Sequence, residues 1–270
     1  MLHYFGYFAA IFIGLSLGIM GGGGSILTVP VPVLVYLIGV NPVLSTAYSL
    51  FIVGSTSLVG AVSYARKGPV SVPTALVFLA TSLAAVFMTR KFLLPAIPHE
   101  LFTMGRIVFT KDLLVAFAVL MVAAATSMIR SRQAEEMLED DEKHQHSVNY
   151  VLILTVGAVV GLLTGFVGAG GGFLIIPALV LFARLPMKLA VGTSLAIIAL
   201  NSLIGFTGDL SAGRVMDWPF LAGFLAFALG GIVLGTYLAR FIPGARLKPA
   251  FGWFTLAMGT FILTKELLFR

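Results

Sequence analysis

The sequence GLSLGIMGGGGSILTVP at residues 14–30 occurs a second time, with changes, as GLLTGFVGAGGGFLIIP at residues 161–177. Glycines and the final proline match at a constant offset of 147 residues. The matched positions are Gly14, Gly18, Gly21, Gly23, Gly24 and Pro30, and Gly161, Gly165, Gly168, Gly170, Gly171 and Pro177. At an offset of 145 the agreement continues from Ser49-Leu50, Ser57-Leu58, Gly60 and Gly68 to Ser194-Leu195, Ser202-Leu203, Gly205 and Gly213. These matches predict a chain built of two repeats.

The composition indicates that most of the surface of this chain lies in lipid. Apolar residues make up 59% of the 270 residues and charged residues 10%, against roughly 25% charged in an ordinary soluble domain. The mean hydropathy is +1.05. These values predict an all-α polytopic membrane protein and argue against a soluble enzyme, a DNA-binding protein and a secreted disulfide scaffold. The absence of cysteine excludes disulfides, iron–sulfur clusters and thiolate zinc sites.

Ten apolar segments are expected, five in each repeat. They lie at about residues 5–20, 25–40, 44–65, 70–90, 110–130, 148–167, 173–183, 188–208, 217–240 and 250–268. The stretch between the halves holds six of the eleven acidic residues, so it cannot lie in hydrocarbon. We therefore expect an N-terminal membrane repeat (1–130), a charged cytoplasmic linker (131–147) and a C-terminal membrane repeat (148–270). No Lys or Arg precedes the first apolar segment, which favours a retained helix over a cleaved signal peptide.

The positions of Lys and Arg predict the orientation of the two repeats. If all ten segments cross, ten of these residues fall on the linker side and seven on the other, so the linker side is cytoplasmic. Five crossings per repeat then make the repeats inverted. If the segments at 25–40 and 173–183 are instead re-entrant, the split becomes nine to eight, and both arrangements stay open. Internal repeats of this kind are typical of secondary transporters, with the substrate site at the repeat interface.

The glycine runs 21–24 and 168–172 predict a helix break in each repeat, with helices restarting near Ser25 and Phe173. Each glycine costs a helix about 1 kcal/mol relative to alanine. A restarting helix presents backbone N–H groups and the positive end of its dipole, and glycine lets a ligand approach the backbone closely. Two such ends favour a small anion such as a sulfur or phosphorus oxyanion or a carboxylate. The alternative is helix packing alone, which we expect for Gly14, Gly18, Gly161 and Gly165 because of their small-xxx-small spacing.

Hydroxyl and amide side chains complete the predicted site. Ser49 and Ser194 are repeat equivalents, Thr193 precedes Ser194, and Asn201 is the amide within a predicted span. Each hydroxyl can instead bond a backbone carbonyl one turn back. The candidate substrate-binding residues are Gly21, Gly22, Gly23, Gly24, Ser25, Ser49, Gly168, Gly170, Gly171, Gly172, Thr193, Ser194 and Asn201.

Ionisable residues are scarce in the predicted spans. No Glu, Lys, Arg or His falls in the middle of one, and Asp209, near the end of the 188–208 segment, is expected at a solvated helix end more than in a proton relay. Arg184 and Lys188 flank the short 173–183 segment and are expected as topology anchors, with attraction of anions as the alternative. The four His lie at ends or in loops. No metal site and no cofactor are predicted.

Two hydrophobic halves, each opening with a G-x-G-G-G/S-x-x-x-x-P element and continuing with a helix containing Tyr48-Ser49-Leu50 or Thr193-Ser194-Leu195, resemble the TauE/SafE sulfite exporter (TSUP) family. The resemblance covers about residues 8 to 268. It implies a multi-pass protein of a bacterial or archaeal cytoplasmic membrane that moves sulfite, sulfonates or related organosulfur anions. One departure is that AYS (47–49) stands where the second repeat has GTS (192–194), so Tyr48 is expected to narrow one side of the pocket.

The sequence and the resemblance together imply a secondary transporter, not an enzyme, that exports a small sulfur anion by alternating access around the paired breaks. A transporter or channel for another small anion, such as a carboxylate, is the alternative. A membrane-embedded enzyme would need a Glu, His and Arg cluster at the glycine runs, and none is present there. No nucleotide-binding motif occurs, so the membrane potential or a proton gradient is the expected driving force. Protons as the coupling ion and a homo-oligomer stay open, and no nucleic-acid partner is expected.

Overall fold

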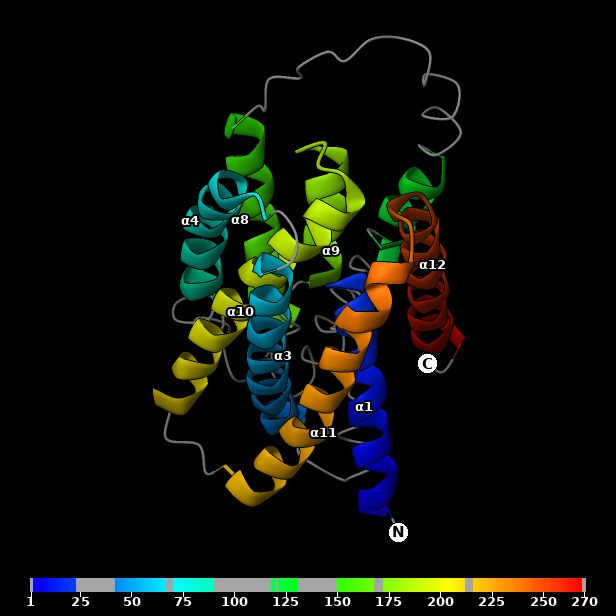
Figure 1. The fold of residues 1–270 in the computed structure, drawn as a ribbon. Coiled ribbons are helices and arrows are strands. Elements are labelled where there is room, and N and C mark those ends of the chain that lie inside the picture. The colour runs from blue at the N-terminus through cyan, green and yellow to red at the C-terminus, as the bar shows by residue number, and fades with distance from the viewer. Residues whose placement is uncertain are drawn as a thin grey trace, which may run out of the picture.

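The computed structural model describes residues 2–22, 42–66, 70–89, 118–119, 121–130, 150–167, 172–211 and 216–268. Over these residues the chain forms helices and no strand (Figure 1). The helices are α1 (Leu2–Met20), α3 (Pro42–Ala65), α4 (Val72–Met88), α8 (Tyr150–Val167), α9 (Gly172–Leu181), α10 (Met187–Ser211), α11 (Trp218–Leu238), the 3₁₀ turn η3 (Ala239–Phe241) and α12 (Gly244–Leu268). The predicted all-α class is confirmed for this part of the chain. The linker 131–147 lies outside the described residues.

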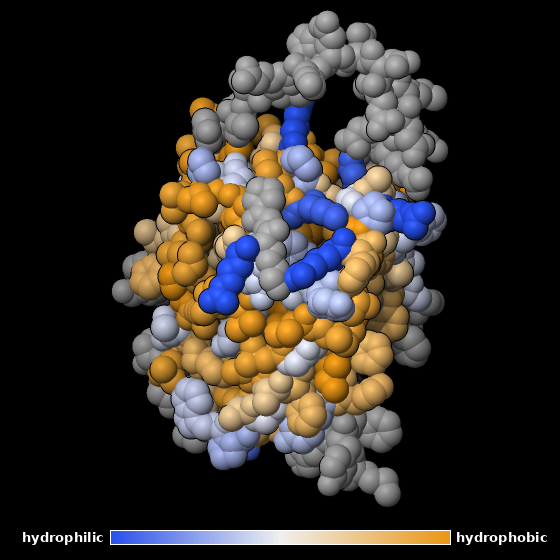
Figure 2. Space-filling view, viewed as in Figure 1, coloured by the Kyte–Doolittle hydropathy of each residue, from blue (hydrophilic) through white to orange (hydrophobic). Residues whose placement is uncertain are grey.

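Three of these helices are long and apolar enough to cross a membrane, at Ala47–Ala65, Met187–Gly208 and Trp218–Phe241. Large hydrophobic side chains are exposed on the surface, where lipid would cover them, and Figure 2 shows this apolar surface in orange. Helix α9 is different, because its 10 residues span only about 15 Å. The hydrocarbon core is about 30 Å thick, so α9 does not cross it alone. Residues 172–180 are all buried, which keeps this short helix inside protein.

Helices α3 and α10 form the centre of the fold and run in opposite directions (Figure 1). A Cβ atom built on Gly60 would lie 3.2 Å from Leu195, and one on Gly54 would lie 3.0 Å from Leu203. The contact of the lower-numbered glycine of α3, Gly54, is therefore with the higher-numbered leucine of α10, Leu203, as expected for antiparallel helices. Small residues on both helices allow this close, antiparallel contact.

The outer helices pair across the two halves of the chain. Gly14 and Gly18 of α1 lie against α11, where a Cβ on Gly18 would come within 2.6 Å of the Thr236 nitrogen. Gly161 and Gly165 of α8 lie against α4, where a Cβ on Gly161 would come within 2.7 Å of the Ser82 Cα atom. The predicted packing role of these four glycines is confirmed, since any side chain would separate the helix backbones.

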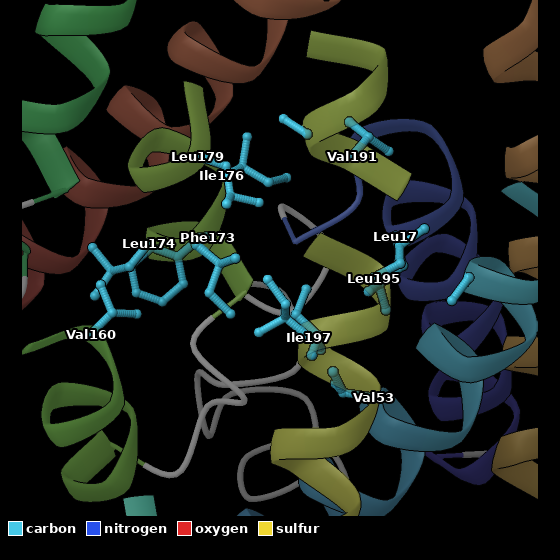
Figure 3. Close-up of a cluster of buried hydrophobic side chains, with 14 of the residues drawn as sticks. Leu17, Val53, Val160, Phe173, Leu174, Ile176, Leu179, Val191, Leu195 and Ile197 are labelled. Atoms are coloured by element: carbon cyan, nitrogen blue, oxygen red, sulfur yellow. The ribbon is translucent and has the colours of Figure 1, made fainter. Parts of the chain in front are cut away.

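The hydrophobic core joins both halves. Figure 3 shows Leu17 of α1 and Val53 of α3 in one cluster with Phe173, Ile176 and Leu195 of α9 and α10. Ile176 and Leu195 are fully buried. The short helix α9 thus lies in the core between helices of the two repeats.

Five cationic side chains in the described part of the chain gather at one end of the helices. Arg66 follows α3, and Arg184 and Lys188 lie just before and at the start of α10. Arg240 lies in η3, and Arg246 lies in the first turn of α12. These helix ends lie at the same end of the molecule because α10 is antiparallel to α3, whereas α11 is parallel to α3. Figure 2 shows the hydrophilic side chains in blue near this end, which we call the linker face because α8 also begins there.

Candidate functional site

The two glycine breaks meet in the structure. Helix α1 ends at Met20, and Gly21 follows with a φ of +63°, a left-handed conformation that favours glycine at a helix end. Gly22 then lies against the first residue of α9, because a Cβ on Gly22 would collide with the carbonyl group of Gly172. The helix ends agree with the predicted breaks, since α1 ends at Met20, α8 ends at Val167 and α9 begins at Gly172. Residues 168–171, between α8 and α9, lie outside the described residues. The restart expected near Ser25 lies outside the described residues.

A serine of α10 lies beside the first break. A Cβ on Gly21 would come within 2.9 Å of the Ser194 Oγ atom, 3.1 Å of Ile176 and 3.2 Å of Val191. The Ser194 hydroxyl is fully buried and donates a hydrogen bond to the Val191 carbonyl at 2.9 Å. The structure therefore brings four of the predicted residues together from three elements, namely Gly21, Gly22, Gly172 and Ser194. The positive end of the α9 dipole lies at the same place.

Ser49, the repeat equivalent of Ser194, lies at a different level. Ser49 precedes Leu50, which meets Gly205, whereas Ser194 precedes Leu195, which meets Gly60. Measured along the axis of α10, the two hydroxyls are therefore about 12 residues, or roughly 18 Å, apart. One small anion therefore does not contact both serines in this conformation. Ser49 is 2% exposed, and its Oγ atom has no hydrogen-bond partner within the described structure.

Thr193 and Tyr48 bond to the starts of other helices. The N–H of Ser71, before α4, donates to the Thr193 hydroxyl at 3.1 Å. The N–H of Asp217, before α11, donates to the Tyr48 hydroxyl at 2.8 Å. The Tyr48 hydroxyl thus reaches the start of α11, and the narrowing of the pocket by Tyr48 stays a prediction.

Asn201 pairs with a side chain that the sequence did not single out. Its amide nitrogen donates to the Ser82 hydroxyl of α4 at 3.0 Å, and both residues are buried. A second polar contact missed from sequence is the Tyr64 hydroxyl, which donates to the Gly18 carbonyl at 3.2 Å in the last turn of α1. Neither contact has a sequence signal, because each joins residues far apart in the chain.

The remaining candidates divide into exposed and undescribed residues. Gly23, Gly24, Ser25, Gly168, Gly170 and Gly171 lie outside the described residues. Arg184 and Lys188 are exposed, and Arg184 has a φ of +51° at the end of α9, where the Leu185 N–H donates to the Leu179 carbonyl at 3.0 Å. That bond is typical of a helix end that stops in a left-handed residue. Within the residues described, no group of His, Cys, Asp and Glu could hold a metal ion.

Comparison with known proteins agrees with this architecture. Residues 7–262 match the family described as Sulfite exporter TauE/SafE. A probable membrane transporter protein of Xylella fastidiosa (strain 9a5c) is 29% identical over 258 residues, which cover 94% of this chain and 92% of that protein. The probable membrane transporter protein YunE of Bacillus subtilis (strain 168) is 26% identical over 234 residues, or 82% of this chain and 83% of that protein.

No solved structure matches the chain significantly. The family match extends over both glycine breaks and over every helix described above except the first residues of α1 and the last of α12. The chain therefore belongs to the TauE/SafE sulfite exporter family of membrane transporters.

Proposed function

We propose that this protein is a secondary transporter that exports a small sulfur-containing anion, such as sulfite or an organosulfonate, by alternating access. The observation that carries the proposal is the meeting of Gly22 and Gly172 beside Ser194. It brings together the positive, N-terminal end of α9 from one repeat, the glycines that follow α1 in the other, and the Ser194 hydroxyl at one buried point without Cβ atoms. The positive end of the α9 dipole and a neutral hydroxyl suit an anion that must be released again.

The helix contacts support two inverted repeats. The α1–α11 contact at Gly14 and Gly18 has a counterpart in the α8–α4 contact at Gly161 and Gly165, where all four glycines follow the offset of 147. Helices α3 and α10, which are also equivalent by sequence, cross in opposite directions. An antiparallel crossing of equivalent helices is expected when the two repeats have opposite orientations in the membrane.

The levels of the two serines support alternating access. Ser194 lies nearer the linker face, where α10 begins, and Ser49 lies nearer the opposite face, where α3 begins. We propose that an anion is held by one serine at a time, with the glycine breaks beside Ser194. An anion that leaves a negative-inside cell gains about 2.3 kcal/mol per charge for each 100 mV, so export needs no other energy source.

The cationic residues support a cytoplasmic linker face. Arg66, Arg184, Lys188, Arg240 and Arg246 all lie at the linker face, where α8 begins. The positive-inside rule places that end in the cytoplasm. We accordingly propose a bacterial or archaeal cytoplasmic membrane, with membrane repeats at 1–130 and 148–270.

Flux measurements in proteoliposomes test the substrate. Uptake or release of labelled sulfite, taurine, sulfoacetate and a simple carboxylate is compared, with and without an imposed membrane potential or pH gradient. We expect sulfite or a sulfonate to move faster than the carboxylate and to respond to the potential. Preferential flux of the carboxylate would replace the sulfur anion by the second candidate, because helix ends accept either group. A response to the pH gradient alone would make protons the coupling ion.

A further inference from the structure

Two hydrogen bonds cross between the halves of the chain in the same way. The Thr193 hydroxyl in the second half accepts from the Ser71 N–H in the first half at 3.1 Å. The Tyr48 hydroxyl in the first half accepts from the Asp217 N–H in the second half at 2.8 Å. Each bond thus joins one half's central helix to the start of a helix in the other half.

The two bonds occupy equivalent positions in the repeats. Tyr48 and Thr193 are 145 residues apart, and Ser71 and Asp217 are 146 residues apart. Both N–H donors belong to N-cap residues of helices that carry proline in the first turn. Tyr48, which stands where the second repeat has Thr193, therefore keeps the same interaction with a longer side chain.

The two bonds lie at opposite faces of the membrane protein. Thr193 is near the start of α10 and Tyr48 is near the start of α3, and these two helices are antiparallel. From the contacts of Gly60 with Leu195 and of Leu50 with Gly205, the two hydroxyls differ in level by about 14 residues, or roughly 20 Å. One bond is therefore at the linker face and the other at the opposite face.

Each bond also adjoins one of the candidate site serines. Thr193 precedes Ser194 and Tyr48 precedes Ser49. A movement that opens a path to Ser194 from the linker face must separate α10 from the start of α4, and water entering that path can then bond the Ser71 N–H. The same reasoning applies to Ser49, α3 and the start of α11 at the opposite face.

We propose that Thr193–Ser71 and Tyr48–Asp217 are paired latches, one at each face, and that each holds its own face closed. This inference rests on the proposed alternating access. It makes Tyr48 and Thr193 positioning residues, whose hydroxyls set the balance between the two open states without contacting the anion. Removing one hydroxyl favours opening at its own face and, because the open states exclude each other, reduces opening at the other.

Cysteine labelling tests the latches, because the chain contains no cysteine of its own. Ser194→Cys and Ser49→Cys are the two reporters, and a membrane-impermeant thiosulfonate is added from one side of vesicles of known orientation. We expect Thr193→Val to raise labelling of Ser194→Cys from the linker face several-fold and to lower labelling of Ser49→Cys from the opposite face. Tyr48→Phe should do the reverse. Changes in the same direction at both reporters, or no change at either, would overturn the proposal.

Matched controls separate a latch from a general loss of packing. Thr56→Val removes a buried hydroxyl that bonds only within α3, to the Ile52 carbonyl at 2.6 Å and the Val53 carbonyl at 3.1 Å, and should leave both labelling rates unchanged. Thr193→Ser keeps the hydroxyl, so the reporters in this variant should be labelled as in the parent protein. A changed labelling in Thr193→Ser would contradict the latch even if Thr193→Val did not fold. Labelling requires no substrate. If the two reporters change labelling in opposite directions but the protein transports no sulfur anion, only the proposed substrate is refuted. If the protein transports the sulfur anion but the two reporters do not change in opposite directions, only the proposed latches are refuted.

Discussion

The backbone of Gly22 lies directly against the carbonyl group of Gly172, so the end of α1 in one repeat meets the start of α9 in the other. The contact joins residues that are far apart in sequence and leaves no room for a Cβ atom. Gly22 and Gly172 therefore set the distance between the two helix ends that the proposed anion site needs.

Gly22→Ala should disrupt this contact. The added Cβ would overlap the Gly172 carbonyl group, and backbone cannot move aside as a side chain tip can. Overpacking of this kind costs about 1–3 kcal/mol, and we expect a lower unfolding temperature together with a loss of most anion flux. Thermal unfolding in detergent and proteoliposome flux measure the two effects. Gly230→Ala is the control, because nothing lies within 4 Å of a Cβ there. Normal flux in Gly22→Ala would show that the close approach is not needed.

Ser49→Ala should separate stability from transport. The Ser49 hydroxyl is buried without a partner in the described structure, and an unsatisfied buried group costs about 1–3 kcal/mol. Removing it should leave stability unchanged or raised by up to about 1 kcal/mol, while transport falls because the anion loses a donor. The measurement is the KM of flux beside the unfolding temperature.

Ser57→Ala and Ser202→Ala are matched controls for this change. Both hydroxyls are also buried without a partner among the described residues, and neither residue is a candidate for the site. They should show the same gain in stability with no change in KM. An unchanged KM in Ser49→Ala as well would remove Ser49 from the proposed site.

Equivalent substitutions at the packing glycines should have equivalent effects. Gly14→Ala places a Cβ within 2.8 Å of the Ile232 nitrogen, and Gly161→Ala places one within 2.7 Å of the Ser82 Cα atom. We expect each to reduce stability by about 1–3 kcal/mol, because helix backbones must separate. Unfolding temperatures of the two variants, with Gly208→Ala as the uncrowded control, measure the effect. A harmless alanine at either glycine would contradict the close packing of that pair.

The Asn201–Ser82 pair should behave as a coupled unit. Asn201→Ala leaves the Ser82 hydroxyl without the amide that now bonds it at 3.0 Å, and Ser82→Ala does the converse. A double-mutant cycle should give a coupling free energy of about 0.6–1.7 kcal/mol, as for hydrogen bonds between membrane helices. If Asn201 also contacts the anion, Asn201→Ala should raise the KM of flux and Ser82→Ala should not. Equal effects on KM would assign both residues to helix packing.

The features that could be predicted from the sequence are those that depend on neighbouring residues. Helical membrane segments follow from runs of apolar residues, and the breaks at Gly21 and Gly172 follow from the low helix propensity of glycine. The packing role of Gly14 and Gly161 follows from their spacing along one helix face. The repeat itself was visible because equivalent residues keep constant offsets.

The partners of these elements were decided only by the tertiary structure. Nothing local to Gly14 indicates that α1 packs on α11 of the other half, and nothing local to Tyr48 indicates a bond to Asp217. The equivalence of Ser49 and Ser194 was visible in the sequence, but their separation depends on the antiparallel crossing of α3 and α10. The physical reason is that helix propensity and hydropathy act along the chain, whereas contacts between distant segments depend on how complete helices fit together.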